Sequence, residues 1–210
     1  MVQTIGISQA ITSLNEANFK FNLTHNQSPD FFREWFDNLP EITELEKQGL
    51  NNLKERYFYY AADNSITEGT LNIIMVSPLL EMANLCDPPF KIKAEQAVKI
   101  ELEDSEIILK GFIDALVVQE QFWIVVIEAK RYGFNVSLAI PQTLAYMMAN
   151  SHQKRPVFGM VTNGEDYIFV KVIHQHKQYD YSDKLTLSKR NNTDFYQVFQ
   201  VIKKLKQLLI

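Results

Sequence analysis

The sequence predicts an α/β fold in which a mixed central β-sheet is flanked by helices. Apolar residues recur at helical spacing in the segments before residue 85 and after residue 191. Between them, short runs of β-forming residues alternate with turn residues and surround one further helical segment. A hydrophobic fraction of 46%, with 12% aromatic residues, is large enough to bury a substantial core.

The first 65 residues are expected to form a helical extension. Residues 1–28 are polar and weakly periodic, and we expect them to form an arm or a short strand. A first helix is predicted from Asp30, the proposed N-cap, because four large aromatic residues follow it at helical spacing. Asn38-Leu39-Pro40 ends this helix, and a second amphipathic helix is predicted to run to about Ala62.

A third helix is predicted from Glu68 to about Leu85, with Thr67 as its cap. Pro78 lies inside this pattern, and a proline in a helix interior removes one backbone hydrogen bond. We therefore expect Pro78 to kink the helix or to divide it in two. Asp87-Pro88-Pro89 marks a firm end.

The remaining segments supply the predicted sheet and two more helices. Strands are expected at 95–103, 106–118, 121–130, 157–162 and 166–173, with an edge strand at 178–187. Helices are expected at 136–150 and 191–210. The chain is thereby divided into an N-terminal extension (1–65), a core (66–190) and a closing helix (191–210), which we expect to form one compact domain.

Composition and charge narrow the class of protein. The formal net charge of −4 argues against an overall basic field, and the one cysteine, Cys86, cannot form an internal disulfide. The first 15 residues lack the continuous apolar stretch of a signal peptide. No uncharged apolar run approaches the ~20 residues of a membrane helix. We expect a cytoplasmic protein that is not associated with a membrane.

Two carboxylates and one amine are predicted to meet on the central hairpin. Asp114 lies in one apolar run, and Glu128 and Lys130 close the next, so antiparallel pairing brings Asp114 back beside Glu128. Glu128 and Lys130 are two residues apart and therefore point to the same face. Charges in a buried sheet are rarely found unless they are paired or bind metal. The pattern predicts a divalent metal held by Asp114 and Glu128, with Lys130 beside it.

The order of these motifs resembles that of the PD-(D/E)xK nuclease superfamily. Gly111-x-x-Asp114, a second strand ending in Glu128-x-Lys130, and a helix carrying Gln142-x-x-x-Tyr146 look like its RecB-like branch. They also resemble the N-terminal nuclease domain of type I restriction enzyme R subunits. There, an early glutamate followed by Pro-Leu-Leu matches Glu68 and the segment that begins at Pro78. The resemblance covers roughly residues 66–175.

The resemblance implies a restriction-endonuclease-like core with the element order αβββαβ. It also implies that six residues meet in one site. Asp114 and Glu128 would hold Mg²⁺, for which Mn²⁺ could substitute, and Lys130 would assist the attacking water. Glu68 would hold a metal-bound water or contribute to the metal site. Gln142 and Tyr146 would position the substrate or the site. The implied activity is that of an endodeoxyribonuclease acting on DNA.

The chain departs from this family in two respects. Ile113 stands where the superfamily name has proline, and the phosphate-binding Gly-x-x-x-x-Gly-Lys-Ser/Thr loop of a motor is missing from the sequence. We therefore expect a solitary nuclease-like domain. Two alternatives stay open: a catalytically silent module that binds nucleic acid or protein, and a nuclease subunit that needs a partner. That partner could be a second copy or a motor or specificity protein.

Overall fold

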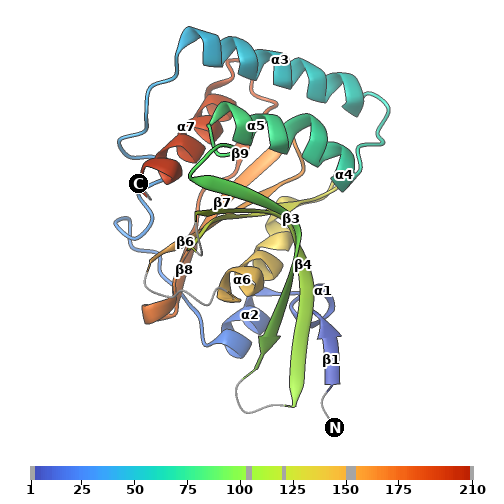
Figure 1. Cartoon of the computed structure of the whole chain (residues 1–210), viewed down its shortest axis with the longest axis vertical. Helices are drawn as coiled ribbons and strands as arrows, with labels where there is room; N and C mark the ends of the chain where they lie inside the picture. The colour runs from blue at the N-terminus through green and yellow to red at the C-terminus, as the bar shows by residue number, and fades with distance from the viewer. Residues whose placement is uncertain (1–2, 103–105, 120–121, 150–154, 209–210) are drawn as a thin grey trace.

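The computed structural model describes residues 3–102, 106–119, 122–149 and 155–208, and it has the predicted mixed α/β architecture (Figure 1). A central mixed sheet lies between two groups of helices. One face is covered by α3 (Glu44–Ala61), α5 (Ser77–Met82) and α7 (Thr193–Gln207). The other is covered by α1 (Ile7–Ala10), α2 (Leu14–Phe21) and α6 (Ile140–Met148). Within the described ranges, none of the helices is long and apolar enough to cross a membrane.

The sheet is mixed because only some neighbouring strands are parallel. Its path in the described residues is β1 (Gln3–Gly6), β4 (Ile107–Gln119), β5 (Phe122–Ala129), β6 (Val157–Thr162), β7 (Asp166–Ile173), β8 (Gln178–Tyr181) and β2 (Thr24–His25). Off this path, β3 (Phe90–Glu101) pairs with β4, and β9 (Leu185–Thr186) pairs with β7. The β5–β6 pair is parallel and is bridged by α6, whereas β3–β4, β4–β5 and β6–β7 are antiparallel.

Alternating side chains of the central strands build two cores, one on each face. On β6, Phe158 and Met160 join the cluster beneath α3, α5 and α7, while Val157 and Val161 join the cluster beneath α6. Strand side chains point to opposite faces with a period of two. A register slip of one residue would therefore exchange the two cores, so burial on both faces fixes the register.

The helix predicted from Asp30 is wrong, because residues 29–38 form turns. Two backbone carbonyls that a helix would use internally are bound elsewhere. The Phe31 carbonyl accepts from Lys171 Nζ at 2.7 Å, and the Trp35 carbonyl accepts from Gln197 Nε2 at 3.0 Å. The aromatic side chains pack on the core from these turns instead, with Phe32 fully buried.

The first 28 residues are more regular than the expected arm or short strand. Besides β1 and β2 they contain α1 and α2. Helix α2 begins with a capping box in which Ser13 and Glu16 satisfy each other's backbone amides. The same device begins α3, where Thr43 and Glu46 form the reciprocal pair.

Pro78 divides the third predicted helix as expected. The segment consists of α4 (Glu68–Leu71), a π-helical turn (Asn72–Val76) and α5. Because Pro78 has no N–H, it cannot donate to the Ile74 carbonyl four residues earlier. Arg56 Nη1 of α3 donates to that carbonyl instead, at 3.3 Å. The irregularity of this helix is thus stabilised by a neighbouring helix.

The later elements follow the prediction with small shifts. Strand β3 begins at Phe90, before the expected residue 95, and the expected edge strand 178–187 is divided into β8 and β9. The helix expected at 136–150 begins as a 3₁₀ turn (Val136–Ala139) before α6. The expected element ends at 103, 121, 150 and 210 and the turn at 104–105 lie outside the described residues.

A buried ion pair ties the turns at 29–38 to the sheet. Lys171 on β7 is 7% exposed, and its Nζ lies 2.5 Å from Glu34 Oε1. The ammonium also lies over the rings of Phe31, Phe32 and Phe158, at 5.3–6.0 Å from their centroids. Glu34 Oε2 is buried without a hydrogen-bond partner, so this carboxylate depends on Lys171 for its compensation.

Replacing Lys171 by methionine should destabilise the protein by about 3 kcal/mol, because Glu34 would be left as an uncompensated, largely buried charge. Urea unfolding followed by circular dichroism measures this loss. The matched control is Lys184→Met, which removes an exposed lysine paired with Asp166 at 3.0 Å and should change the free energy of unfolding by less than about 0.5 kcal/mol. Equal losses of unfolding free energy in both variants would contradict the stabilising role of the Lys171–Glu34 ion pair.

Candidate functional site

Asp114 and Glu128 lie on neighbouring strands and leave the same face of the sheet. The β4–β5 register pairs Ala115 with Ile127 and Leu116 with Val126, which places Asp114 opposite Glu128. Both carboxylates therefore face the side covered by α6, as Val126 does. Asp114 is held in place by the backbone N–H of Ala129, which donates to Asp114 Oδ2 at 2.7 Å. The hairpin predicted from the sequence is present.

Lys130 lies beside this carboxylate pair. Its Nζ is 2.5 Å from Glu128 Oε1, as expected for side chains two residues apart on one face. The backbone N–H of Lys130 donates to the Thr162 carbonyl of the parallel strand β6 at 2.7 Å. The ammonium also lies 6.0 Å from the centre of the Phe134 ring. Lys130 is thus fixed at the carboxyl end of β5, next to a parallel neighbour.

Glu128 is a buried carboxylate with one free oxygen. The residue is 2% exposed, and its Oε2 has no hydrogen-bond partner. Burial raises the pKa of Glu128 to about 8, and the neighbouring charge of Asp114 adds to this effect, while Lys130 opposes it. Burial likewise raises the pKa of Asp114 to about 6, against the opposing effects of the Ala129 amide and Lys130. A cation between these groups would stabilise both ionised forms.

Glu68 lies near the pair without joining it in a cluster. It is the first residue of α4, follows the cap Thr67, and its side chain is exposed. Its charge contributes to the raised pKa values of Asp114 and Glu128. Among the described residues, however, no group of three or more His, Cys, Asp or Glu side chains is arranged to hold a metal ion. In this structure Glu68 therefore affects the two carboxylates through the electrostatic effect of its charge.

Gln142 and Tyr146 lie one turn apart on α6 and contact each other. Gln142 Nε2 donates to Tyr146 Oη at 2.9 Å. Burial raises the pKa of Tyr146 to about 12, and the charges of Glu128 and Asp114 add to the shift, so the phenol faces the carboxylate pair. A Cβ atom at Gly111 would lie 2.8 Å from Tyr146 Cε1. Gly111 is therefore needed for the close approach of this ring to β4.

Sequence reasoning missed one acidic residue, Glu95. The β3–β4 register pairs Ala94 with Ala115 and Gln96 with Ile113, so Glu95 is placed across from Asp114. Its backbone has φ of 49°, a left-handed conformation uncommon for residues other than glycine. The charge of Glu95 also raises the pKa of Asp114. Its position follows from the pairing of two strands and has no local signal in the sequence.

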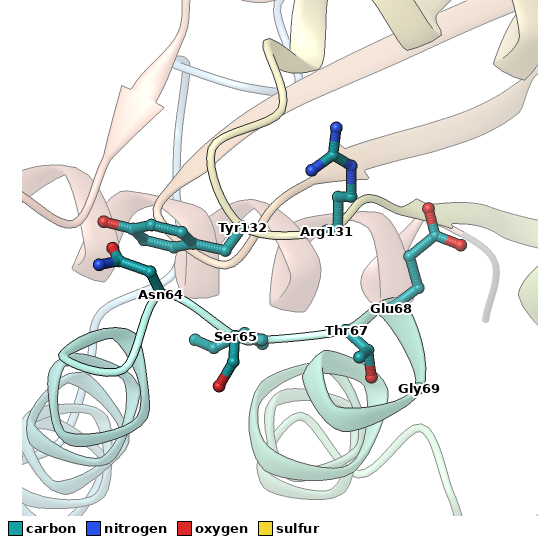
Figure 2. A pocket seen from close by; sticks show the side chains of 8 residues that line it. Asn64, Ser65, Thr67, Glu68, Gly69, Arg131 and Tyr132 are labelled. Carbon is teal, nitrogen blue, oxygen red and sulfur yellow. The ribbon is translucent and has the colours of Figure 1, made fainter.

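A hollow lies at Glu68, whose charge acts on the carboxylate pair (Figure 2). Its volume is ≈ 580 Å³. It is lined by Asn64, Ser65, Ile66, Thr67, Glu68, Gly69, Arg131 and Tyr132. Glu68 and Arg131 approach it from different elements, because Arg131 directly follows Lys130 after β5, whereas Glu68 begins α4.

Comparisons with known proteins give little further guidance. No family model matches this chain, and no curated protein matches it. Among solved structures, a chain in the cryo-EM structure of the DrdV–DNA complex is similar, with 10% sequence identity and a TM-score of 0.48. The match covers 77% of this chain and 13% of that chain. So distant a likeness does not identify the site, whose interpretation rests on its own geometry.

The raised carboxylate pKa values predict a pH-dependent stability. Glu128 has its pKa raised from an ordinary 4.5 to about 8, so at intermediate pH the folded state holds a proton that the unfolded chain has released. The free energy of unfolding should therefore fall as pH rises from about 5 to about 8. We expect a decrease in melting temperature on the order of 5 °C over this range.

The control is Glu128→Gln, which keeps the shape of the side chain and cannot ionise. Its melting temperature should depend less on pH over the same range. Differential scanning calorimetry of both proteins in the same buffers gives the comparison. Identical pH profiles for the two proteins would exclude Glu128 as the source of the pH-dependent stability.

Proposed function

We propose that this protein hydrolyses phosphodiester bonds in DNA by means of a divalent metal ion bound by Asp114 and Glu128. The observation that carries the proposal is the buried, unpartnered Oε2 of Glu128 beside a second carboxylate. A buried carboxylate oxygen without a partner is costly, and a hard cation such as Mg²⁺ or Mn²⁺ prefers oxygen ligands. One or two carboxylates suffice for Mg²⁺, which keeps several waters.

Each residue of the pair has a separate supporting contact. The Ala129 amide fixes the orientation of Asp114, and Lys130 binds the other oxygen of Glu128, so that Oε2 stays free. When bound, Mg²⁺ would lower the pKa of a water and offset charge on the phosphate. The Lys130 ammonium is placed to orient the attacking water or to donate a hydrogen bond to the developing negative charge.

Two further observations support DNA hydrolysis. The site lies at the carboxyl end of β5, next to the parallel strand β6, and ligands of open α/β sheets bind beyond the carboxyl ends of strands. The motifs at Asp114, Glu128-x-Lys130 and Gln142-x-x-x-Tyr146 resemble those of PD-(D/E)xK nucleases, which supports an endodeoxyribonuclease. In such a nuclease Gln142 and Tyr146 would position the substrate or the site, and Glu68 would hold a metal-bound water or contribute to the metal site.

A second candidate is a nuclease subunit that acts only together with a partner. The net charge of −4 favours it, because DNA binding draws much of its affinity from basic residues. A partner with a basic surface would supply that affinity. Cleavage that appears only after a partner is added would distinguish this candidate from a protein that acts alone.

Asp114→Asn and Lys130→Met should each lower the rate of DNA cleavage by about 100-fold or more, because each removes a group expected to act on the transition state. The assay compares plasmid and linear DNA with the purified protein in Mg²⁺, in Mn²⁺ and in chelator. Glu81→Gln, on the exposed side of α5, is the control and should cleave at the wild-type rate. Undiminished cleavage by folded Asp114→Asn protein would refute the site.

Gly111→Ala tests whether Tyr146 positions the site. The new methyl group would overlap the Tyr146 ring and push it away from β4. We expect a fall in kcat of about 10- to 100-fold with little change in Mn²⁺ affinity, which is measured separately by calorimetry. Gly6→Ala is the matched control, because a Cβ there would meet nothing closer than 3.7 Å. A rate unchanged in Gly111→Ala would exclude this role.

A further inference from the structure

The hollow lined by Glu68 and Arg131 is built on contacts of the folded chain. The backbone N–H of Tyr132 donates to the Ile66 carbonyl at 3.1 Å, which joins the loop after β5 to the segment before α4. Ile66 is 3% exposed and belongs to the main core, so the base of the hollow is anchored. The cavity is therefore part of the folded scaffold.

The lining combines an aromatic surface with polar groups. Tyr132 is half-buried and packs against the core, and the exposed Asn64 amide lies beside its ring (Figure 2). This combination suits a nucleobase, because its face stacks on aromatic rings and its edge forms hydrogen bonds. The volume of ≈ 580 Å³ lies within the range of small-molecule sites.

Arg131 adds a positive charge to the lining and directly follows Lys130 in the sequence. It is exposed, and within the described part of the chain its guanidinium makes no hydrogen bond or ion pair. Its Cα lies three residues beyond that of Glu128, which limits their separation to about 10 Å. Guanidinium groups bind phosphate oxygens through paired hydrogen bonds. Arg131 is thus placed to bind a phosphate next to the one that is cleaved.

From this arrangement, and resting on the proposed function, we infer that the hollow binds one unpaired nucleotide of the DNA substrate. Its base enters against Tyr132, and the phosphate attached to it binds Arg131. The preferred substrate is therefore a single strand or an unpaired end. A base inside a duplex is stacked and paired, and it could enter the hollow only after being extruded at an energetic cost.

The test measures binding separately from cleavage. A 5′-fluorescein-labelled twelve-residue oligothymidylate and a twelve-base-pair duplex are titrated with protein in Ca²⁺, and fluorescence anisotropy gives their dissociation constants. Gel electrophoresis confirms that both stay intact. We expect the wild-type protein to bind the single strand more tightly, and Arg131→Ala to weaken that binding about tenfold, the effect of losing a charge-assisted contact.

A second variant blocks the hollow without changing its charge. A Cβ at Gly69 would meet only Thr67 Oγ1, at 4.0 Å, so Gly69→Trp places a large side chain at the hollow without backbone strain. It should weaken single-strand binding at least as much as Arg131→Ala. The control Arg190→Ala removes an exposed arginine that lines a different cavity, and it should bind like the wild type.

Three outcomes would overturn the inference. They are equal or tighter binding of the duplex, single-strand binding that neither variant weakens, and an equal loss in Arg190→Ala. Failure of the proposed hydrolysis has a different signature, since DNA would then stay uncut in Mg²⁺ whatever the binding constants are. The two proposals can therefore fail independently.

Discussion

The burial of Glu128 beside Asp114 is the constraint on which the site depends. Two carboxylates that have lost much of their hydration repel each other, and only Lys130 and the Ala129 amide compensate them in the described residues. The sheet holds them together because β4 and β5 are packed between two cores, and a one-residue shift in register would move the side chains of each core to the opposite face. The stability of the surrounding fold is what keeps this unfavourable pair in position.

Much of the sheet could be predicted because its strands carry their own signal. Strands β6 and β7 agree with the prediction to the residue, since apolar runs flank Asn163-Gly164, and Gly164 adopts φ of 88° in the turn. Residues 29–38 could not be predicted in this way. Their aromatic spacing suits a helix, but side chains from distant segments, Lys171 and Gln197, bind their carbonyls. Tertiary hydrogen bonds decided that segment, and they have no local signature.

The residues of the candidate site also differ in whether local sequence or long-range contacts determine their positions. Asp114, Glu128 and Lys130 lie on one hairpin, so their proximity follows from local pairing, and Gln142 and Tyr146 follow from helical spacing. The position of Glu95 depends on the register of β3 against β4, which the sequence does not specify alone. The hollow likewise needs the segment 64–69 to meet the loop after β5. The chemical groups are local features, whereas the surroundings that determine what they bind are built by long-range contacts.

The left-handed residue opposite Asp114 also affects how copies of this protein behave toward one another. Strand β3 is long, and in the described part of the chain it hydrogen-bonds only to β4. A long, straight outer strand invites another chain to add to it and so to aggregate. The distorted backbone at Glu95 interrupts the regular row of amide and carbonyl groups, and exposed Lys91, Lys93 and Lys99 repel a second copy. The feature that crowds acidic groups at the site thus also protects the sheet from growing at its edge.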